Sequence, residues 1–394
     1  MGTIATLVAL PVLVYRLTGS AALTALVSGL EAAPYVVFGL VAGALSDRWN
    51  RRRTMVTAEL LGAALLASIP LAHLLDVMTV PHILAVAFLG PTLATFFDGA
   101  SFGAVPTLVG RDRIGQANSY VWTVQGLAEV VTPAAAGVAL AVVHPSALLA
   151  LDSLSYLVSG LLILGIRRPM QFTSSDGQPV LTMRQVGADI GEGLRFLWHH
   201  VGVRTMTVVG FTQCVSGGGF VALMVVWADQ QLGVGTEGLR FGIVYGSWAV
   251  GSVLASVALP RVLRRASPAR VMLYSLPVSA VLGIVAPVWN AWWLGSLSLL
   301  AWSVAYTMVV INSITYRQEV TPDHLLGRVN TAGRMIAWGL GWTGGAFLAG
   351  VLSGFLSVQP TLFVMTSVSL VGVVLAWTSP LARGADRAHP LTSG

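Results

Sequence analysis

The sequence predicts an all-α integral membrane protein, with about twelve transmembrane helices in two pseudo-symmetric six-helix bundles. Three observations predict this fold: the composition, the length of the apolar segments and the one-sided placement of arginine. The chain has 394 residues, of which 55% are hydrophobic and 10% are charged. Soluble domains carry about 25% charged residues, so a soluble protein of this composition would expose large apolar patches and aggregate.

The apolar segments have the length of membrane-spanning helices, which need about 20 mostly apolar residues. They are too long for buried strands, and clusters of Gly, Pro, Asn and Arg separate them. The first begins almost at Met1, so we expect a short first helix or a native start upstream of Met1. The twelve segments lie near residues 3–17, 22–45, 55–75, 82–107, 118–143, 146–166, 204–228, 240–260, 269–288, 291–314, 330–354 and 360–378.

All 22 basic residues are arginine, and their placement predicts the topology. When loops are assigned alternately to the two sides, one side receives every arginine except Arg16 and Arg240. The positive-inside rule makes the arginine-rich side cytoplasmic. We therefore expect a multi-pass protein of the plasma (inner) membrane with both termini in the cytoplasm. The pI near 10 does not indicate nucleic-acid binding, because these charges lie in loops beside the apolar segments.

The longest polar stretch divides the segments six and six. We expect a six-helix bundle over 1–167, a cytoplasmic linker over 168–203, a second bundle over 204–379 and a cytoplasmic tail over 380–394. Inside the linker, Val186, Ile190, Leu194 and Leu197 share one face of a predicted helix, which suits a helix lying on the cytoplasmic leaflet. The adjacent His199 and His200 would point to different faces, so a solvated loop end is favoured over a metal site.

The two halves also resemble each other. The stretch GRDRIGQANSY at 110–120 parallels PDHLLGRVNTA at 322–332, at a spacing of 212 residues. In each, a polar turn is followed by Gly, then after two intervening residues by Asn, and then by a long Gly-rich helix. Both loops fall on the cytoplasmic side, so the repeat keeps its orientation in the membrane.

The stretch GALSDRWNRRR at 43–53 resembles the loop 2–3 signature of the major facilitator superfamily. The stretches at 9–20, 96–109, 192–200 and 320–331 resemble the branch of that family that holds enterobactin exporters and macrolide efflux proteins. The resemblance implies two parallel six-helix halves and transport by alternating access. Asn50 stands where the signature has its second Gly, and Asn tolerates a left-handed backbone better than most residues.

The resemblance also implies a gate or latch on the cytoplasmic face. Gly43 would permit close helix approach, and Asp47 would meet the N-terminus of the helix that follows Gly327 and Arg328, where the helix dipole is positive. Asp98, inside the fourth predicted helix, needs a partner and would join the same latch. The alternative is that the arginines of the 43–53 stretch only anchor this loop at lipid headgroups. The candidate partners of Asp98 are Arg48, Arg51 and Arg52.

Two acidic residues lie near the middle of predicted spans, Glu31 in the second and Glu129 in the fifth. Acids at this depth are rare and usually functional, so we expect Glu31 or Glu129 to accept the coupling proton. The alternative is a structural hydrogen bond to a neighbouring Ser or Thr. Asp152, Asp229 and Glu237 lie near the outer ends of their spans and are expected to be hydrated.

A central substrate cavity can be outlined from the polar and aromatic residues at mid-membrane depth. Trp rings with a few amides suit an amphipathic organic molecule, although Trp at helical spacing also serves packing. The run SGGGF at 216–220 is interpreted as a flexible kink rather than an anion-binding nest. The cavity candidates are Trp122, Gln125, Gln213, Asn312, Trp338 and Trp342.

Together these features predict a proton-coupled antiporter that exports a drug, a macrolide or a siderophore-like molecule. An uptake symporter on the same fold and a non-transporting membrane sensor are the alternatives. Without Lys there is no phosphate-binding GxxxxGK[ST] loop or lysine Schiff base, and the lone Cys214 excludes a CxxC site. The sequence holds no catalytic motif, so we do not expect an enzyme. We expect no metal and no cofactor, and a proton gradient as the energy source. The expected partners are a small-molecule substrate and the lipid bilayer, without nucleic acid, and the protein is expected to be a monomer.

Overall fold

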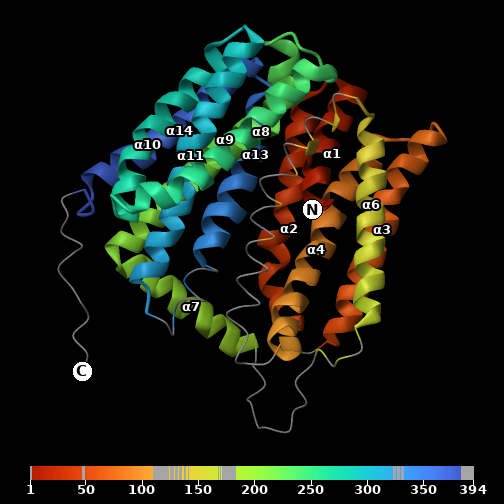
Figure 1. Cartoon of the computed structure of the whole chain (residues 1–394), viewed down its shortest axis with the longest axis horizontal. Helices are drawn as coiled ribbons and strands as arrows, with labels where there is room; N and C mark the ends of the chain where they lie inside the picture. The colour runs from red at the N-terminus through yellow and green to blue at the C-terminus, as the bar shows by residue number, and fades with distance from the viewer. Residues whose placement is uncertain are drawn as a thin grey trace. The chain divides into compact units, whose positions relative to one another are not determined.

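The computed structural model describes residues 2–46, 49–109, 142–166, 168, 170, 183–322, 325, 329 and 332–382, with scattered positions between 124 and 140. Every regular element within these residues is a helix (Figure 1). Ten of the described helices are long and apolar enough to cross a membrane, and Thr6–Thr18 adds a shorter apolar helix. The prediction of an all-α chain of membrane-spanning helices is therefore confirmed.

Contacts between residues divide the chain into two compact units. The first unit holds residues 1–186 and 236–246, and the second holds 187–235 and 247–394. The fifth predicted helix, 118–143, falls almost entirely outside the described residues. The helices of the first unit are α1 (Gly2–Thr18), α2 (Ala21–Ser46), α3 (Arg51–Leu74), α4 (Val80–Val109) and α6 (Pro145–Gly165).

The chain from residue 183 onward forms the remaining helices. The boundary between the units falls in α7, after Val186, and the first turns of α9 belong to the first unit. The helices are α7 (Met183–His199), α8 (Val201–Gln230), α9 (Gly238–Leu263), α10 (Pro268–Val285), η2 (Ala286–Val288), α11 (Trp292–Val320), the π-helix η4 (Met335–Trp342), α13 (Thr343–Leu352) and α14 (Val358–Thr378).

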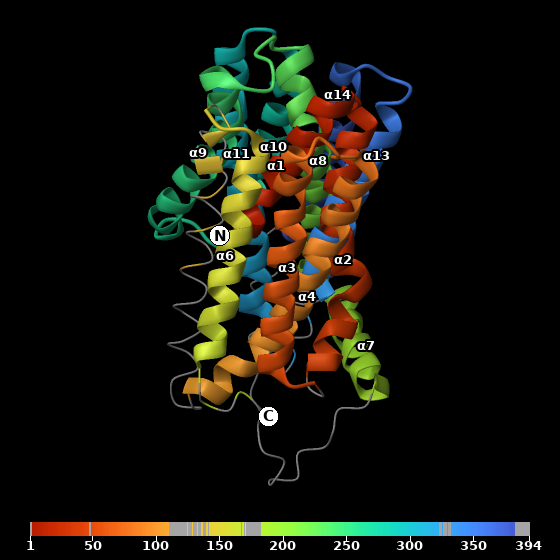
Figure 2. The same cartoon turned by 90° about the vertical axis from the view of Figure 1, so that its right-hand side faces the viewer.

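In the first unit, α4 packs against α2 and α3, and α6 packs against α3 and α1 (Figure 2). Small residues allow the close contact between α3 and α6. A Cβ added at Gly62 would lie 2.8 Å from the Tyr156 ring, and one at Gly160 would lie 3.2 Å from Cβ of Glu59. Small residues at helix crossings are typical of membrane proteins, because association in lipid depends on close van der Waals packing.

In the second unit, α8 is the central helix and packs against α11, α13, α14 and η4. The glycines of the SGGGF run each face a different neighbour. A Cβ at Gly217 would lie 2.7 Å from the Tyr306 hydroxyl of α11, one at Gly218 would lie 2.7 Å from the Trp342 carbonyl, and one at Gly219 would meet Met365 of α14. α8 is a continuous helix from Val201 to Gln230, and these glycines allow three neighbouring helices to pack closely against it. The flexible kink expected from the sequence is wrong.

A cluster of aromatic rings from α8, α9 and α11 fills part of the interior of the second unit. Trp302 of α11 is fully buried and makes edge-to-face contacts with Phe220, at a centroid distance of 4.9 Å, and with Trp248, at 5.1 Å. Phe220 in turn contacts Trp227 at 5.3 Å. Edge-to-face pairs contribute about 0.5–1.5 kcal/mol beyond the area they bury, so these rings give the unit a rigid centre.

The predicted amphipathic helix in the linker is present as α7, but its C-terminal turns pack against other parts of the protein. Leu197 is fully buried and shares a cluster with Val203, Leu325 and Val329. The expectation that this face lies on the lipid leaflet is therefore wrong for the C-terminal turns of α7. His200 follows as the N-cap of α8, and its Nδ1 accepts the backbone N–H of Val203 at 3.2 Å.

Candidate functional site

Glu31 is buried in the middle of α2, where 3% of its surface is exposed. Pro34 lies three residues later and cannot donate to the Leu30 carbonyl, so the helix has an interrupted hydrogen bond beside the carboxyl group. Among the described residues, Oε1 of Glu31 has no hydrogen-bond partner, although the Tyr245 hydroxyl lies within electrostatic range. The alternative of a structural hydrogen bond to Ser or Thr finds no support at this oxygen.

Two further acids are buried in the first unit, and sequence reasoning missed their importance. Asp152 of α6 is 3% exposed, and it accepts hydrogen bonds from the Thr6 hydroxyl and, at 3.1 Å, from the Ser155 hydroxyl. The expectation of a hydrated Asp152 is therefore wrong. Glu59 of α3 is also buried and bonds Ser159. Its position inside an apolar segment was a signal for Glu59 that the sequence analysis did not use.

The arginine-rich turn before α3 is held by protein groups. Asn50 caps α3 by accepting the Arg53 backbone N–H at 3.0 Å, and its φ of −66° shows that the left-handed backbone expected there is not used. Arg51 is buried and donates to Thr107 at 3.5 Å and to the Met170 carbonyl at 3.4 Å. Arg52 donates to the carbonyl groups of Ile163 and Leu164.

The other residues of the predicted latch are placed only in part. Gly43 lies in the last turns of α2, and Asp98 is an exposed residue of α4 that engages in an electrostatic or hydrogen-bonding contact. Asp47, Arg48, Gly327 and Arg328 lie outside the described residues. The latch itself stays a prediction.

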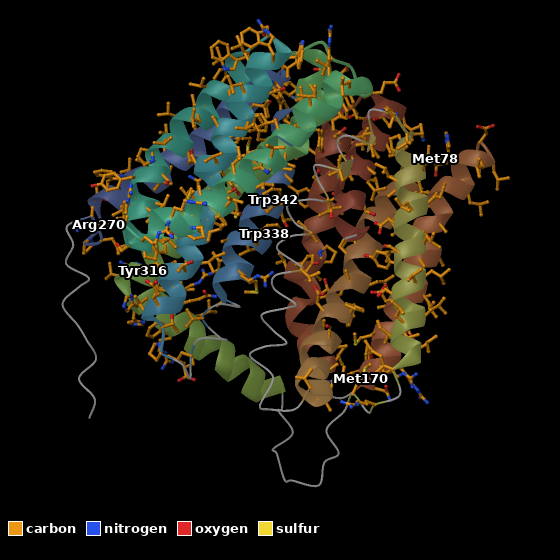
Figure 3. All side chains as sticks on the ribbon, viewed as in Figure 1. Met78, Met170, Arg270, Tyr316, Trp338 and Trp342 are labelled. Atoms are coloured by element: carbon orange, nitrogen blue, oxygen red, sulfur yellow. The ribbon has the colours of Figure 1, made fainter. Side chains whose placement is uncertain are left out.

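Trp338 and Trp342 are brought together by the π-helix η4 (Figure 3). Their rings stack at a centroid distance of 5.3 Å and an interplanar angle of 7°. A π-helix makes i→i+5 hydrogen bonds and widens the helical turn, so residues four apart lie nearly above one another. Trp338 is 52% exposed, and the pair therefore presents an accessible aromatic surface. π-helical turns are frequent at functional sites.

Two amides proposed for the cavity are buried inside the second unit. Oε1 of Gln213 accepts from the Ser279 hydroxyl at 3.3 Å, and Nδ2 of Asn312 donates to the Met308 carbonyl at 2.7 Å. Within the described part of the chain, Nε2 of Gln213 and Oδ1 of Asn312 have no hydrogen-bond partner. Buried polar atoms are usually satisfied, so these two positions are polar sites that a rearrangement or a ligand can complete. The remaining candidates, Trp122, Gln125 and Glu129, lie outside the described residues.

Arg317 is a buried cation that the sequence analysis placed in a loop. α11 continues to Val320, so Arg317 lies in its last turn and is buried. Its guanidinium rests where a Cβ at Gly333 would be, so a larger residue at position 333 would require the Arg317 side chain to move. The end of an apolar segment marks where hydropathy changes, and it does not mark where a helix ends.

The sequence profile of the Major Facilitator Superfamily matches residues 1–337. The chain belongs to the major facilitator superfamily. The members are transporters of small molecules in membranes, and this one is a multi-pass membrane protein. The expectation of a transporter rather than an enzyme is confirmed by this membership.

The curated relatives of this superfamily member include drug efflux pumps. It is 27% identical over 395 residues to the multidrug efflux pump Tap of Mycolicibacterium fortuitum, an alignment that covers 97% of this chain and 93% of the relative. It is 32% identical over 221 residues to Tap of Mycobacterium tuberculosis strain H37Rv, covering 52% of this chain and 50% of the relative. Macrolide efflux protein A of Streptococcus pyogenes is 28% identical over 152 residues, covering 39% and 38%. The predicted resemblance to macrolide efflux proteins is confirmed.

Solved transporters share the fold at low sequence identity. The nucleoside transporter NupG aligns with a TM-score of 0.69 at 13% identity, covering 95% of this chain and 94% of that chain. A bacterial homologue of the human lysosomal transporter Spinster aligns with a TM-score of 0.68 at 12% identity, covering 98% and 94%. At these identities the likeness shows the fold, and it carries nothing about the substrate.

Proposed function

We propose that this protein is a proton-coupled antiporter that exports amphipathic organic molecules, such as drugs or macrolides, by alternating access. The export direction and substrate class are supported by the full-length relationship to a multidrug efflux pump. The coupling is supported by one observation above the others, the buried carboxyl group of Glu31 in α2 with an unsatisfied oxygen.

The coupling role of Glu31 follows from the energetics of charge in a membrane. A charged side chain at the bilayer centre costs at least ~2.5 kcal/mol, so an acid is retained there where its charge is used. A carboxyl group that binds a proton in one conformation and releases it in another converts a proton gradient into a conformational preference. Glu129 stays the second candidate for the same role. Gly341, its counterpart in the repeat, packs against the Phe211 carbonyl and Cys214.

The substrate surface that we propose is centred on Trp338 and Trp342. Their stacked, accessible rings suit a flat apolar face, and the unsatisfied amide atoms of Gln213 and Asn312 suit the polar groups of an amphipathic molecule. Trp122 and Gln125 complete the proposed set. Broad substrate choice is consistent with aromatic contacts, which demand less directional precision than hydrogen bonds.

The proposal includes the topology and the gate that the sequence predicts. We place the protein in the plasma (inner) membrane as a monomer, with both termini in the cytoplasm. The cytoplasmic gate involves Gly43, Asp47, Arg48, Arg51, Arg52, Asp98, Gly327 and Arg328.

The test is a transport assay in everted membrane vesicles with an acidic interior. We expect a radiolabelled macrolide to accumulate inside, and a protonophore to abolish the accumulation. Glu31→Gln should reduce proton-driven accumulation by about 100-fold or more, because a step that depends on a protonation change is lost. The matched control Glu192→Gln removes an exposed acid of α7 and should transport normally.

Other outcomes assign other functions. Loss of substrate from loaded everted vesicles, driven by the same gradient, would indicate an uptake symporter. Substrate binding without any flux would indicate a sensor. Normal accumulation by both Glu31→Gln and Glu129→Gln would show that neither acid couples transport to protons.

A further inference from the structure

We infer that the turn between α9 and α10 binds the headgroup of an anionic phospholipid, and that the neighbouring faces of α10 and α14 hold its acyl chains. This inference concerns the second unit alone, and it does not depend on the substrate or the direction of transport.

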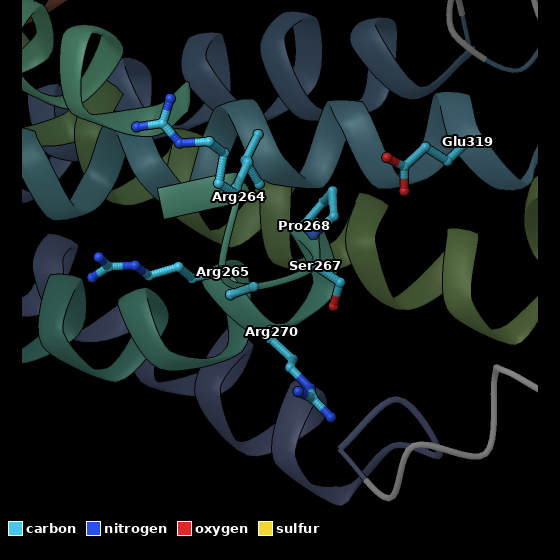
Figure 4. A pocket seen from close by; sticks show the side chains of 8 residues that line it. Arg264, Arg265, Ser267, Pro268, Arg270 and Glu319 are labelled. Carbon is cyan, nitrogen blue, oxygen red and sulfur yellow. The ribbon is translucent and has the colours of Figure 1, made fainter. Parts of the chain in front are cut away.

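The headgroup site is a shallow depression of about 360 Å3, open on one side (Figure 4). Arg264 and Arg265 of the turn and Arg270 of the first helical turn of α10 line it, and their guanidinium groups extend outward in different directions (Figure 4). Glu319 is the one acid among the lining residues. The three arginines are exposed, and no described residue forms a hydrogen bond or an ion pair with the guanidinium group of any of them. Their charge is available to an external anion.

The corresponding turn of the first unit is different. There Arg51 and Arg52 donate to Thr107 and to the backbone carbonyl groups of Ile163, Leu164 and Met170. These contacts use the guanidinium groups inside the protein. The two turns therefore differ at Arg51 and Arg52, whose guanidinium groups bond protein groups, whereas the guanidinium groups of Arg264, Arg265 and Arg270 bond no described residue.

The start of α10 adds backbone donors to this site. Ser267 is the N-cap but makes no side-chain capping bond, and Pro268 follows at the first helical position. The first-turn N–H groups of a helix have no intrahelical partner, and a helix N-terminus favours a phosphate group. Charge and donors thus point to the same ligand chemistry, a phosphodiester.

The faces beside the depression indicate a lipid rather than a free anion. Tyr274 lies one turn after Arg270, is 67% exposed, and contacts the Trp377 ring of α14 at a centroid distance of 6.1 Å. Trp377 is 48% exposed and donates its indole N–H to the Leu273 carbonyl at 3.2 Å. Exposed Tyr and Trp mark the interface between headgroups and acyl chains. The exposed apolar side chains of α10 and α14 include Val278, Val281, Leu370 and Val374.

The strength expected from this arrangement can be bounded. Each basic residue at an anionic surface contributes about fivefold to lipid binding. Three of them predict a preference for phosphatidylglycerol over phosphatidylcholine of about tenfold to 100-fold, since such contributions add incompletely.

The experiment measures lipid contact at Trp377 by fluorescence quenching. The full chain and its Trp377→Phe variant are reconstituted in phosphatidylcholine vesicles that contain either dibrominated phosphatidylglycerol or dibrominated phosphatidylcholine. The difference between the two proteins isolates the Trp377 signal. We expect the brominated phosphatidylglycerol to quench it with a relative binding constant at least about tenfold higher, and R264Q/R265Q/R270Q to remove that preference.

The control R168Q/R195Q/R204Q removes three other exposed arginines and should keep the preference. Equal quenching by the two lipids would overturn the inference, and so would a preference that survives in R264Q/R265Q/R270Q or disappears equally in the control. A preference abolished by millimolar inorganic phosphate at constant ionic strength would assign a free anion instead. If the triple variant is not monodisperse, Arg270→Gln alone replaces it, with an expected loss of about fivefold.

Discussion

In the first unit, the buried polar side chains include three carboxyl groups, those of Glu31, Glu59 and Asp152, whereas no carboxyl group is buried in the described part of the second unit. The second unit instead buries a cluster of aromatic rings around Trp302 and a run of closely packed glycines. Two halves with a shared loop motif have therefore acquired different interiors.

Under the proposed function, this difference corresponds to a division of roles between the units. Buried acids weaken a membrane protein, because the charged form is costly in lipid, so they are retained where proton chemistry needs them. Rings and glycines at close contact give rigidity, because packing is the main force between helices in a membrane. We interpret the first unit as the proton-handling unit and the second as a rigid frame that presents Trp338 and Trp342.

The largest effect is expected at the aromatic cluster. Trp302→Ala should lower the free energy of unfolding by about 3–5 kcal/mol, because it leaves a cavity between α8, α9 and α11. Trp293→Ala, at a ring that is 56% exposed, should change it by less than about 0.5 kcal/mol. Denaturant unfolding in mixed micelles measures both. Equal losses in the two variants would remove the claim of a rigid centre.

The glycine contacts of the second unit can be tested with two adjacent residues of α13. A Cβ at Gly345 would lie 2.9 Å from the Val215 Cα of α8, whereas one at Gly344 would meet nothing within 4 Å. Gly345→Ala should therefore destabilise the protein by about 1–3 kcal/mol. Gly344→Ala should be neutral or stabilising by about 0.5–1 kcal/mol. The same unfolding measurement decides, and an unaffected Gly345→Ala would contradict the close contact.

The buried acids of the first unit can be tested by a double-mutant cycle on Thr6 and Asp152. Thr6→Val and Asp152→Ala should show an interaction energy of about 1–2 kcal/mol, because their side chains share a hydrogen bond. Thr6→Val combined with Thr92→Val should be additive within about 0.5 kcal/mol, since Thr92 bonds the Phe88 carbonyl of its own helix. If the first pair were additive, Asp152 would have no energetic coupling to Thr6, as the sequence-based expectation of a hydrated side chain implies.

The smallest effect is expected in the first unit at the start of α6, beside the last turn of α3. Nδ1 of His144 caps α6 by accepting the Ser146 N–H at 3.3 Å, and its ring stacks on His73 at 4.2 Å. Burial lowers the pKa of His144 below its usual 6.5, and the nearby His73 adds to the shift. The folded state therefore binds this proton less readily than the unfolded state, and its stability is full above pH 6.5 and falls as the pH drops through the lowered pKa.

The measurement is the thermal midpoint of unfolding between pH 7.5 and pH 5. Wild type should lose less than about 1 kcal/mol, the usual contribution of an N-cap. His144→Asn keeps a capping oxygen without titrating, so it should show a shallower pH dependence. An identical slope in the two proteins would show that the cap is not the titrating element.

Predictions from the sequence were wrong at residues whose role depends on which of several partners they meet in the fold. Asn50 was expected to replace a left-handed Gly, and the structure uses its side-chain oxygen as a helix cap. The glycines at 217–219 are permissive residues in isolation, and only the neighbouring helices turn them into contact points. Asp152 looks hydrated by depth along its helix, because depth carries no information about the Thr6 hydroxyl that reaches it from α1.

The sequence by itself determined the solvent, the helices and the family. In lipid, the backbone polar groups of a membrane-spanning segment must form hydrogen bonds within the helix. Long apolar segments meet this requirement, and they can be recognised from composition and spacing. Only the tertiary structure decided that Glu59 and Asp152 are buried, that the π-helix stacks Trp338 on Trp342, and that Arg51 is held inside while Arg264, Arg265 and Arg270 stay free. These are properties of which side chains meet across helices, and hydropathy along one chain does not specify partners.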